Sequence, residues 1–164
     1  MINKIRPYLL SLVALMACAD YCRAQEKPEL IMDVEPVFQE KETKWKVERV
    51  NVHVNNYDPF TQEMTFRSGS FQAAISVSIW RREIDAHDVF QGTSIAFSQS
   101  GGAKKIKRRL PNLGDENYIW TNPHNTAWPT IYFRQGNVQV SVFAPSVAVA
   151  KRFARHIADQ IPSN

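Results

Sequence analysis

The sequence predicts an α+β fold, with one antiparallel sheet and two helices packed on one face. Three observations favour it. Several segments alternate apolar and polar residues with the period of a strand, two segments repeat apolar residues at helical spacing, and short turns join neighbouring strand candidates. Antiparallel strands with separate helices are typical of α+β domains. With 44% hydrophobic and 22% charged residues, the chain is not a disordered protein.

The first 24 residues have the pattern of a secretory signal peptide. Lys4 and Arg6 give a positive start, and the apolar stretch 8–19 is shorter than the roughly 20 residues that a membrane-spanning helix needs. A cut after Ala24 or after Ala19 fits the preference for small residues. We expect the cut after Ala24, an exported mature chain beginning at Gln25, and no membrane span once the signal is removed.

Two alternatives to simple secretion remain open. Leu15-Met16-Ala17-Cys18 resembles a bacterial lipobox, in which Cys18 is lipidated and anchors the protein to the envelope. An uncleaved anchor is the other. A cut after Ala24 removes both cysteines, Cys18 and Cys22, and lowers the net charge from +4 to +2. A mature chain of this charge gives little reason to expect a nucleic-acid partner.

The chain divides into the signal peptide 1–24, a polar leader 25–43 and a single α+β domain 44–164. The leader is acidic and is interrupted by Pro28 and Pro36, so we expect it to be loosely held, with a short strand at 30–34. A chain of this length buries roughly two-thirds of its unfolded surface, which is enough for one core.

Strands are expected where the alternation is clearest, and helices where it stops. The strands are 46–54 with a bulge near Glu48 or Arg49, 64–67, 71–80, a basic strand at 104–110, 118–120, 130–134 and 138–143. Between residues 120 and 130 we expect an irregular segment that contains two prolines and no strand. A helix at 85–98 is expected to be capped by Asp85, and a second at 146–161 by Ser146. These two helices are expected to cover the same face.

Two short motifs carry a resemblance to a group of proteins. Gly114-Asp115-Glu116-Asn117-Tyr118 and Arg134-Gln135-Gly136-Asn137-Val138, followed by a terminal helix, resemble small exported bacterial α+β domains of unknown function. Some domains of this kind are the extracellular sensor portions of membrane proteins. Asn117 departs from the small residue usual at its place. The resemblance implies an exported α+β domain and implies no reaction.

Lys105, Lys107 and Arg109 are the first candidate binding residues. On a strand these side chains share one face at about 7 Å spacing. Such a row offers a surface for anionic ligands such as phosphate, anionic lipid or acidic glycan. A solvated edge strand, on which lysines prevent aggregation, explains the same row and is the favoured interpretation.

Trp120 and Trp128 are the second candidates. Together with Tyr118 and Tyr132 they form an aromatic cluster that can stack on sugars or peptides, or can close one end of the core. Burial is the favoured interpretation, because large aromatic side chains usually lie inside.

No motif predicts catalysis, a metal site or a cofactor. The histidines lack metal-ligand spacing, there is no Gly-x-Ser-x-Gly turn, and Asp115-Glu116 is best explained as a loop leading into a strand. We therefore expect an exported binding or sensor-like domain whose partner is a protein or an envelope component. The alternatives are a lipoprotein anchored through Cys18, and a hydrolase whose site is assembled from scattered residues.

Overall fold

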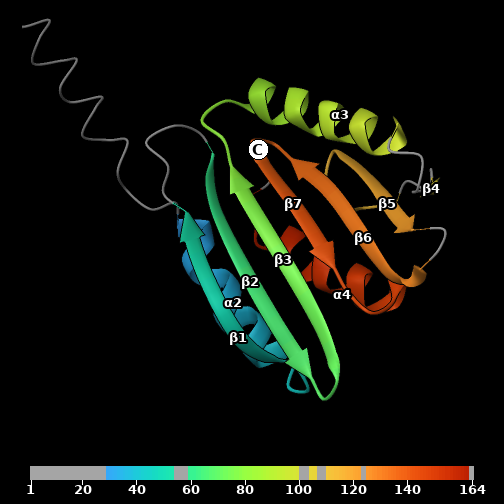
Figure 1. Cartoon of the computed structure of the whole chain (residues 1–164). Helices are drawn as coiled ribbons and strands as arrows, with labels where there is room; N and C mark the ends of the chain where they lie inside the picture. Colours follow the sequence, from blue (N-terminus) through green and yellow to red (C-terminus); the bar gives the residue numbers. More distant parts are fainter. Residues whose placement is uncertain (1–28, 54–58, 100–103, 107–109, 123–124, 163–164) are drawn as a thin grey trace, which may run out of the picture.

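A single antiparallel sheet organises the chain. The computed structural model describes residues 29–53, 59–99, 104–106, 110–122 and 125–162. Within them seven strands lie in the order β1-β2-β3-β7-β6-β5-β4, and each neighbouring pair is antiparallel (Figure 1). The elements are α2 (Glu29–Lys41), β1 (Lys46–His53), β2 (Phe60–Ser68), β3 (Phe71–Ile79), α3 (Glu83–Gln99), β4 (Lys104–Ile106), β5 (Glu116–Asn122), β6 (Asn125–Gln135), β7 (Val138–Phe143) and α4 (Val147–Ala158). The predicted α+β class is confirmed.

The best-predicted strands are those with the cleanest alternation. β7 has the predicted bounds, β3 differs by one residue, and the expected bulge in β1 lies between Val47 and Arg49. β6 is longer than predicted, because residues 125–129, which were expected to be irregular, belong to the strand and include Pro129. Pro129 has no N–H to donate, but its carbonyl oxygen accepts a hydrogen bond from the Ala144 N–H at 3.3 Å. The prediction of an irregular segment is therefore wrong for residues 121–122 and 125–129, which lie in β5 and β6, while residues 123 and 124 lie outside the described residues.

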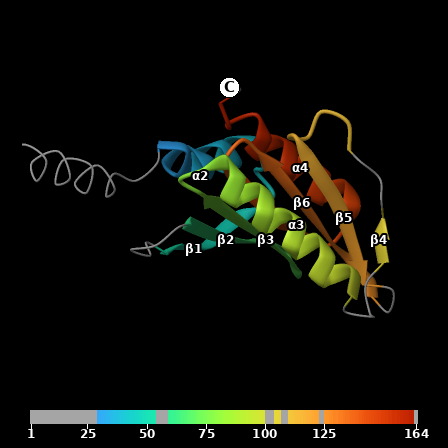
Figure 2. The same ribbon diagram turned by 90° about the horizontal axis from the view of Figure 1, so that it is seen from above.

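Two helices do cover one face, but they are α2 and α4, and α3 lies on the other side (Figures 1 and 2). Alternate residues of β5 show this division: Ile119 belongs to the core beneath α4, while Tyr118 packs against Phe90 of α3. The expected pairing of the helix at 85–98 with the last helix on one face is corrected. Aromatic residues make the second side of β5 and β6 apolar as well, and this provides the surface for α3.

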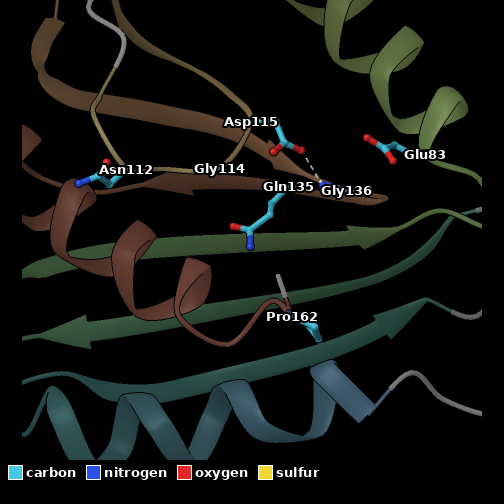
Figure 3. A pocket seen from close by; sticks show the side chains of 7 residues that line it. All are labelled: Glu83, Asn112, Gly114, Asp115, Gln135, Gly136 and Pro162. Carbon is cyan, nitrogen blue, oxygen red and sulfur yellow. Dashed lines mark hydrogen bonds between the residues drawn. The ribbon is translucent and has the colours of Figure 1, made fainter. Parts of the chain in front are cut away.

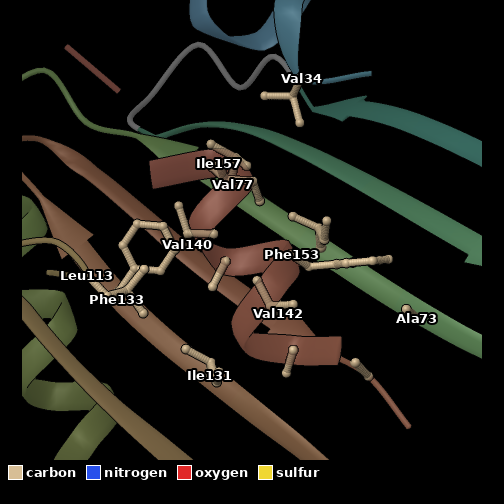
Figure 4. Close-up of a cluster of buried hydrophobic side chains, with 14 of the residues drawn as sticks. Val34, Ala73, Val77, Leu113, Ile131, Phe133, Val140, Val142, Phe153 and Ile157 are labelled. Atoms are coloured by element: carbon tan, nitrogen blue, oxygen red, sulfur yellow. The ribbon is translucent and has the colours of Figure 1, made fainter. Parts of the chain in front are cut away.

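The segment expected as a polar leader forms helix α2, and the strand expected at 30–34 is wrong. Val34 and Phe38 lie four residues apart on one side of the helix, and both are almost fully buried. Phe38 packs against Phe66 and Phe153 with ring centroids 4.9 and 4.8 Å apart. Pro36 lies inside the helix on its exposed side. The domain core therefore begins within α2, ahead of residue 44 (Figure 4).

The ends of the other helices are partly as predicted. Ser146 caps α4, where its hydroxyl oxygen accepts a hydrogen bond from the Val149 N–H at 3.3 Å. Asp85 is not a cap, because α3 begins two residues earlier; its carboxylate instead pairs with the guanidinium of Arg82. None of the helices in the described ranges is long and apolar enough to cross a membrane.

A buried carboxylate joins α2 to α4. The Glu42 side chain is 6% exposed and accepts hydrogen bonds from Arg152, at 2.5 and 3.0 Å, while His156 lies 3.0 Å away. Burial opposes ionisation of Glu42, but the hydrogen bonds from Arg152 and His156 outweigh it and hold the carboxyl pKa below its ordinary value. The ion pair thus fixes the end of α2 on the last helix.

Glu42→Gln is expected to lower the free energy of unfolding by about 1–2 kcal/mol at pH 7, because charge-assisted hydrogen bonds become neutral ones. The folded pKa of Glu42 lies below the unfolded value, so its contribution is present above the unfolded pKa and is lost as pH falls through the folded pKa. Urea unfolding from pH 7 to pH 3 tests this. The difference between the two proteins should be constant above pH ~5 and should shrink toward pH 3. A difference that does not depend on pH would contradict it.

Candidate functional site

Two features of the fold are candidates for function. One is a group of charged side chains around a buried arginine at the β6–β7 turn, called here the Arg134 cluster and consisting of Arg134, Glu83, Asp115, Glu116 and His87. The other is the side of β1, β2 and β3 that faces the same way as α3, called here the open face.

Arg134 is at the centre of its cluster, with a side chain only 8% exposed. Its guanidinium lies 3.0 Å from a carboxylate oxygen of Glu83, 3.4 Å from Asp115 and 3.1 Å from Glu116, and it donates to the carbonyl oxygen of Gly136 at 2.6 Å. Burial opposes the charge of Arg134, but the hydrogen bonds to Glu83 and Glu116 raise the pKa of the guanidinium. One cation therefore connects the start of α3, the start of β5 and the β6–β7 turn.

Glu116 is shared between this arginine and α3. Its carboxylate oxygen Oε1 lies 2.7 Å from His87 Nδ1, and Oε2 accepts a hydrogen bond from the Gln91 amide. Burial again opposes ionisation, and the hydrogen bonds from His87 and Arg134 outweigh it, so the pKa of Glu116 lies below its ordinary value. The contacts of Glu116 hold α3 against the sheet, which is a structural role.

The two motifs noticed in the sequence meet at this point. The Asp115 N–H donates to the Arg134 carbonyl at 2.8 Å, and an Asp115 carboxylate oxygen accepts from the Gly136 N–H, also at 2.8 Å. Asn137 donates to the Trp80 carbonyl, and the Trp80 N–H donates to the Asn137 carbonyl. These hydrogen bonds join the loop before β5, the β6–β7 turn and the end of β3 to one another. The residues of both motifs therefore make contacts that stabilise the fold.

Gly114 is required by this contact. Its φ is +60°, and a Cβ placed there would lie 2.4 Å from the Arg134 carbonyl oxygen. Gly69, in the β2–β3 turn, has almost the same φ of +59° but no atom within 4 Å of such a Cβ. Strain from positive φ alone costs about 1–2 kcal/mol for alanine.

Gly69→Ala is therefore expected to lower the free energy of unfolding by about 1 kcal/mol, and Gly114→Ala by at least about 2 kcal/mol. Urea denaturation of both variants measures the difference. Equal losses would show that the loop moves away from Arg134 without cost.

A pocket of about 370 Å³ adjoins the cluster (Figure 3). Its lining is formed by Glu83, Asn112, Gly114, Asp115, Gln135, Gly136 and Pro162. The pair of His87 and Glu116, which is the nearest arrangement to an acid–base couple, is not part of this lining. The two acidic residues of the lining, Glu83 and Asp115, are both paired with the guanidinium of Arg134.

The basic candidates can be placed only in part. Lys105 lies in β4, where the backbone register pairs it with Trp120. β4 is the last strand of the sheet in the described part of the chain, as the edge-strand interpretation expects. Lys107 and Arg109 lie outside the described residues. The strand predicted at 104–110 is described only as Lys104–Ile106.

The tryptophan candidates are not brought together. Trp120 is 5% exposed, and its ring centroid lies 4.6 Å from that of Phe97 in α3, so it belongs to the core. Trp128 is half-buried and stacks on Phe143, with centroids 5.3 Å apart and an interplanar angle of 10°. Phe143 is 40% exposed. The aromatic surface that remains is therefore Trp128 with Phe143.

The histidines have separate partners. His53 lies 3.6 Å from Glu63, His87 contacts Glu116 and His156 contacts Glu42, while His124 lies outside the described residues. Among the residues that the structure describes, no three histidine, cysteine or acidic side chains gather in a way that suits a metal ion.

The open face follows from the register of the strands. Tyr132 faces α3, and residues directly opposite each other on neighbouring strands point to the same side of a sheet. Starting from Tyr132, the register leads to Ser141, then Ser76, Glu63 and Asn51. The rows on either side place more residues on this face: His53, Thr61 and Ser78 in one, Arg49, Thr65 and Ala74 in the other.

Small polar side chains dominate the open face, and its charges are of both signs. α3 packs over β6 and β7, and no described helix covers β1 and β2 on this side (Figure 1). The hydroxyls of Thr61 and Ser78 lie 3.1 Å apart, and His53 lies beside Glu63. The Trp128–Phe143 pair adjoins the face, because Phe143 is paired with Ala74. The result is a broad polar surface with an aromatic border.

Comparison of the chain with protein-family models, with curated proteins and with solved structures finds no match.

Proposed function

We propose that this protein is an exported, non-enzymatic binding domain, and that its open face docks a folded protein of the cell envelope. The observation that carries the proposal is the polar side of β1, β2 and β3, which no helix of the described residues covers and which adjoins the aromatic pair of Trp128 and Phe143. The first 24 residues, with their signal-peptide pattern, support the compartment.

The shape and charge of the open face favour a protein over other ligands. Small molecules are usually held in concave pockets that bury most of their surface, whereas a sheet face is broad. A polyanion such as acidic glycan requires a surface of one sign. Here Arg49 and His53 lie on the same face as Glu63, and the Arg67 guanidinium is paired with Glu48. A mixed surface with short hydroxyl side chains suits a polar protein interface with an aromatic anchor.

Export is tested by the N-terminus of the protein expressed from its full coding sequence and purified from the compartment in which it accumulates. The proposal expects residue Gln25 at the N-terminus and recovery outside the cytoplasm. A lipid-modified Cys18 would establish the alternative of an envelope lipoprotein. An intact N-terminus recovered from the cytosol would contradict export.

Binding is tested with Ser76→Arg, which places a long charged side chain in the middle of the open face. Ser70→Arg is the matched control, because Ser70 is exposed in the β2–β3 turn. The native chain and each variant are separately crosslinked to proteins of the envelope fraction, and the proteins captured by each are compared. We expect one protein to be retained by the native chain and by Ser70→Arg, with at least tenfold less on folded Ser76→Arg. Retention that is equal on all three would contradict the role of the open face.

A further inference from the structure

The cations of the open face gather at one corner of the sheet, which we call the basic corner and which consists of Lys46, Arg49 and Arg67. Arg49 lies opposite Thr65, and Arg67, two positions further along β2, lies opposite Lys46. All three cations are exposed. Arg67 is paired with Glu48, whereas Lys46 and Arg49 have no ion-pair partner among the described side chains.

The other acidic residue on these strands does not neutralise the corner. Glu63 lies opposite Asn51, in the row of residues next to that of Arg49, and its carboxylate is 3.6 Å from His53. His53 follows Asn51 by two positions, whereas Arg49 precedes it by two, so Glu63 is directed away from Arg49. A carboxylate from another molecule would therefore supply the counter-charge of Arg49.

The aromatic pair of the open face lies in the same row as Arg49. The register leads from Arg49 to Thr65, then to Ala74 and Phe143, and Trp128 stacks on Phe143 (Figure 1). Neighbouring strands are about 4.8 Å apart, so three steps across the sheet separate Phe143 from Arg49 by about 14 Å. The row thus joins an aromatic pair to the basic corner, with only short side chains between them.

We propose that the partner docks on the open face through an extended acidic segment, with an apolar side chain on Phe143 and Trp128 and a carboxylate on Arg49 and Lys46. This rests on the proposed function and names the chemistry that the face recognises. An extended chain advances about 3.3 Å per residue, so the two anchoring side chains are expected about four positions apart. Arginine is well suited to the carboxylate, because its guanidinium donates two parallel hydrogen bonds.

The arrangement favours such a segment over a polyanion. A polyanion gains from charge alone, but the cations are confined to one corner, and Glu48 and Glu63 lie close to them. Exposed ion pairs contribute little, because water and salt screen them. Phe143 is 40% exposed, and an apolar side chain placed on it removes apolar surface from water. A single peptide with both anchors is expected to bind with a Kd of about 0.1–1 mM.

Selection of random nonapeptides on the purified protein tests the proposed chemistry. The peptides are displayed in many copies on phage, so that weak binders are retained. The proposal expects selected peptides to carry aspartate or glutamate three to five positions from an apolar residue, and expects folded Arg49→Glu to lose this enrichment. Selected peptides that are rich in lysine or arginine, or that show no preferred charge, would overturn the proposal.

Matched variants then locate the two anchors, with one selected peptide titrated by NMR. Arg49→Glu and Phe143→Ser are each expected to raise the Kd at least fivefold. The controls are Arg155→Glu, which is exposed on α4, and Phe71→Ser, which is 55% exposed at the start of β3. Each control should change the Kd less than twofold. Dependence on Arg49 without dependence on Phe143 would show that any anion is attracted, and would overturn the proposal.

A charge swap tests the carboxylate contact itself. The same peptide with lysine in place of its acidic residue should bind Arg49→Glu at least fivefold more tightly than it binds the native chain. Equal affinity for the two proteins would contradict a direct contact with Arg49.

The capture experiment with Ser76→Arg separates this proposal from the proposed function. If the open face retains an envelope protein but the selected peptides are not acidic, the docking face stands and the acidic segment is overturned. If acidic peptides bind as expected and no envelope protein is retained, the recognised chemistry stands and the proposed function fails.

Discussion

Arg134→Met is expected to lower the free energy of unfolding by about 3 kcal/mol, because it leaves three carboxylates around a position that has lost its cation. Glu116 is the most affected, since its side chain is 25% exposed and its depressed pKa depends partly on Arg134. Removing one partner of a buried ion pair typically costs 3–5 kcal/mol. The lower end applies here, because Glu83 and Asp115 are 60% and 49% exposed and remain solvated.

Urea unfolding at pH 7 measures this loss, and Arg82→Met is its matched control. Arg82 is also an arginine in an ion pair, but its side chain is 72% exposed. Its loss should cost less than about 1 kcal/mol. Similar losses of stability from the two substitutions would mean that the Arg134 cluster stabilises the fold no more than an exposed ion pair does. A second readout is pH: the cost of Arg134→Met should shrink at low pH, as the surrounding carboxylates become protonated and no longer repel one another.

Phe38→Ala is expected to lower the free energy of unfolding by about 4 kcal/mol. The Phe38 ring is 1% exposed and contacts Phe66 and Phe153, with the His156 ring at 5.7 Å, so its removal leaves a cavity between α2, β2 and α4. A loosely held leader would give almost no change. This substitution therefore distinguishes a helix that belongs to the core from a dispensable segment.

Phe71→Ala is the matched control for Phe38→Ala. Phe71 is 55% exposed at the start of β3, and its truncation should cost less than about 1 kcal/mol. Urea denaturation midpoints and slopes of both variants give the two values. A loss below about 1 kcal/mol for Phe38→Ala would show that the core is complete without α2.

The sequence predicted those parts of the fold in which one side of an element is apolar. In β3, the buried residues Ala73, Ile75 and Val77 alternate with less buried ones, most of them polar, and the bounds of the strand were predicted within one residue. In α4, Phe153 and Ile157 repeat at helical spacing, and the helix and its cap were predicted. Such elements show their buried side directly in the spacing of apolar residues.

The spacing of apolar residues fails to predict the fold where both sides of an element are buried, or where only a few residues of the element are buried. β5 has Ile119 on one side and Tyr118 and Trp120 on the other, so the alternation does not tell which helix lies where. In α2, only Val34 and Phe38 among the described side chains enter the core, and acidic residues with Pro36 conceal their four-residue spacing.

The Arg134 cluster was not predicted as a cluster, although its residues were noticed in two motifs. Contacts between Arg134, Glu83 and Glu116 join segments up to 51 positions apart in the chain, and no local pattern encodes them. One signal was available: Arg134 follows Tyr132 on the same side of a strand, so a charge continues a row of aromatic residues. A charged residue in such a place needs partners of opposite charge, and the two motifs contain the acidic pair Asp115-Glu116.

If the charged clusters hold the fold together and the open face binds the partner, then crosslinks to the partner should form from the open face. Photo-crosslinking in living cells measures this, with a photoreactive amino acid placed at position 76 on the open face or at position 155 on the exposed side of α4. We predict one discrete crosslinked protein from position 76 and none from position 155. Adducts from position 155 with none from position 76 would contradict the claim.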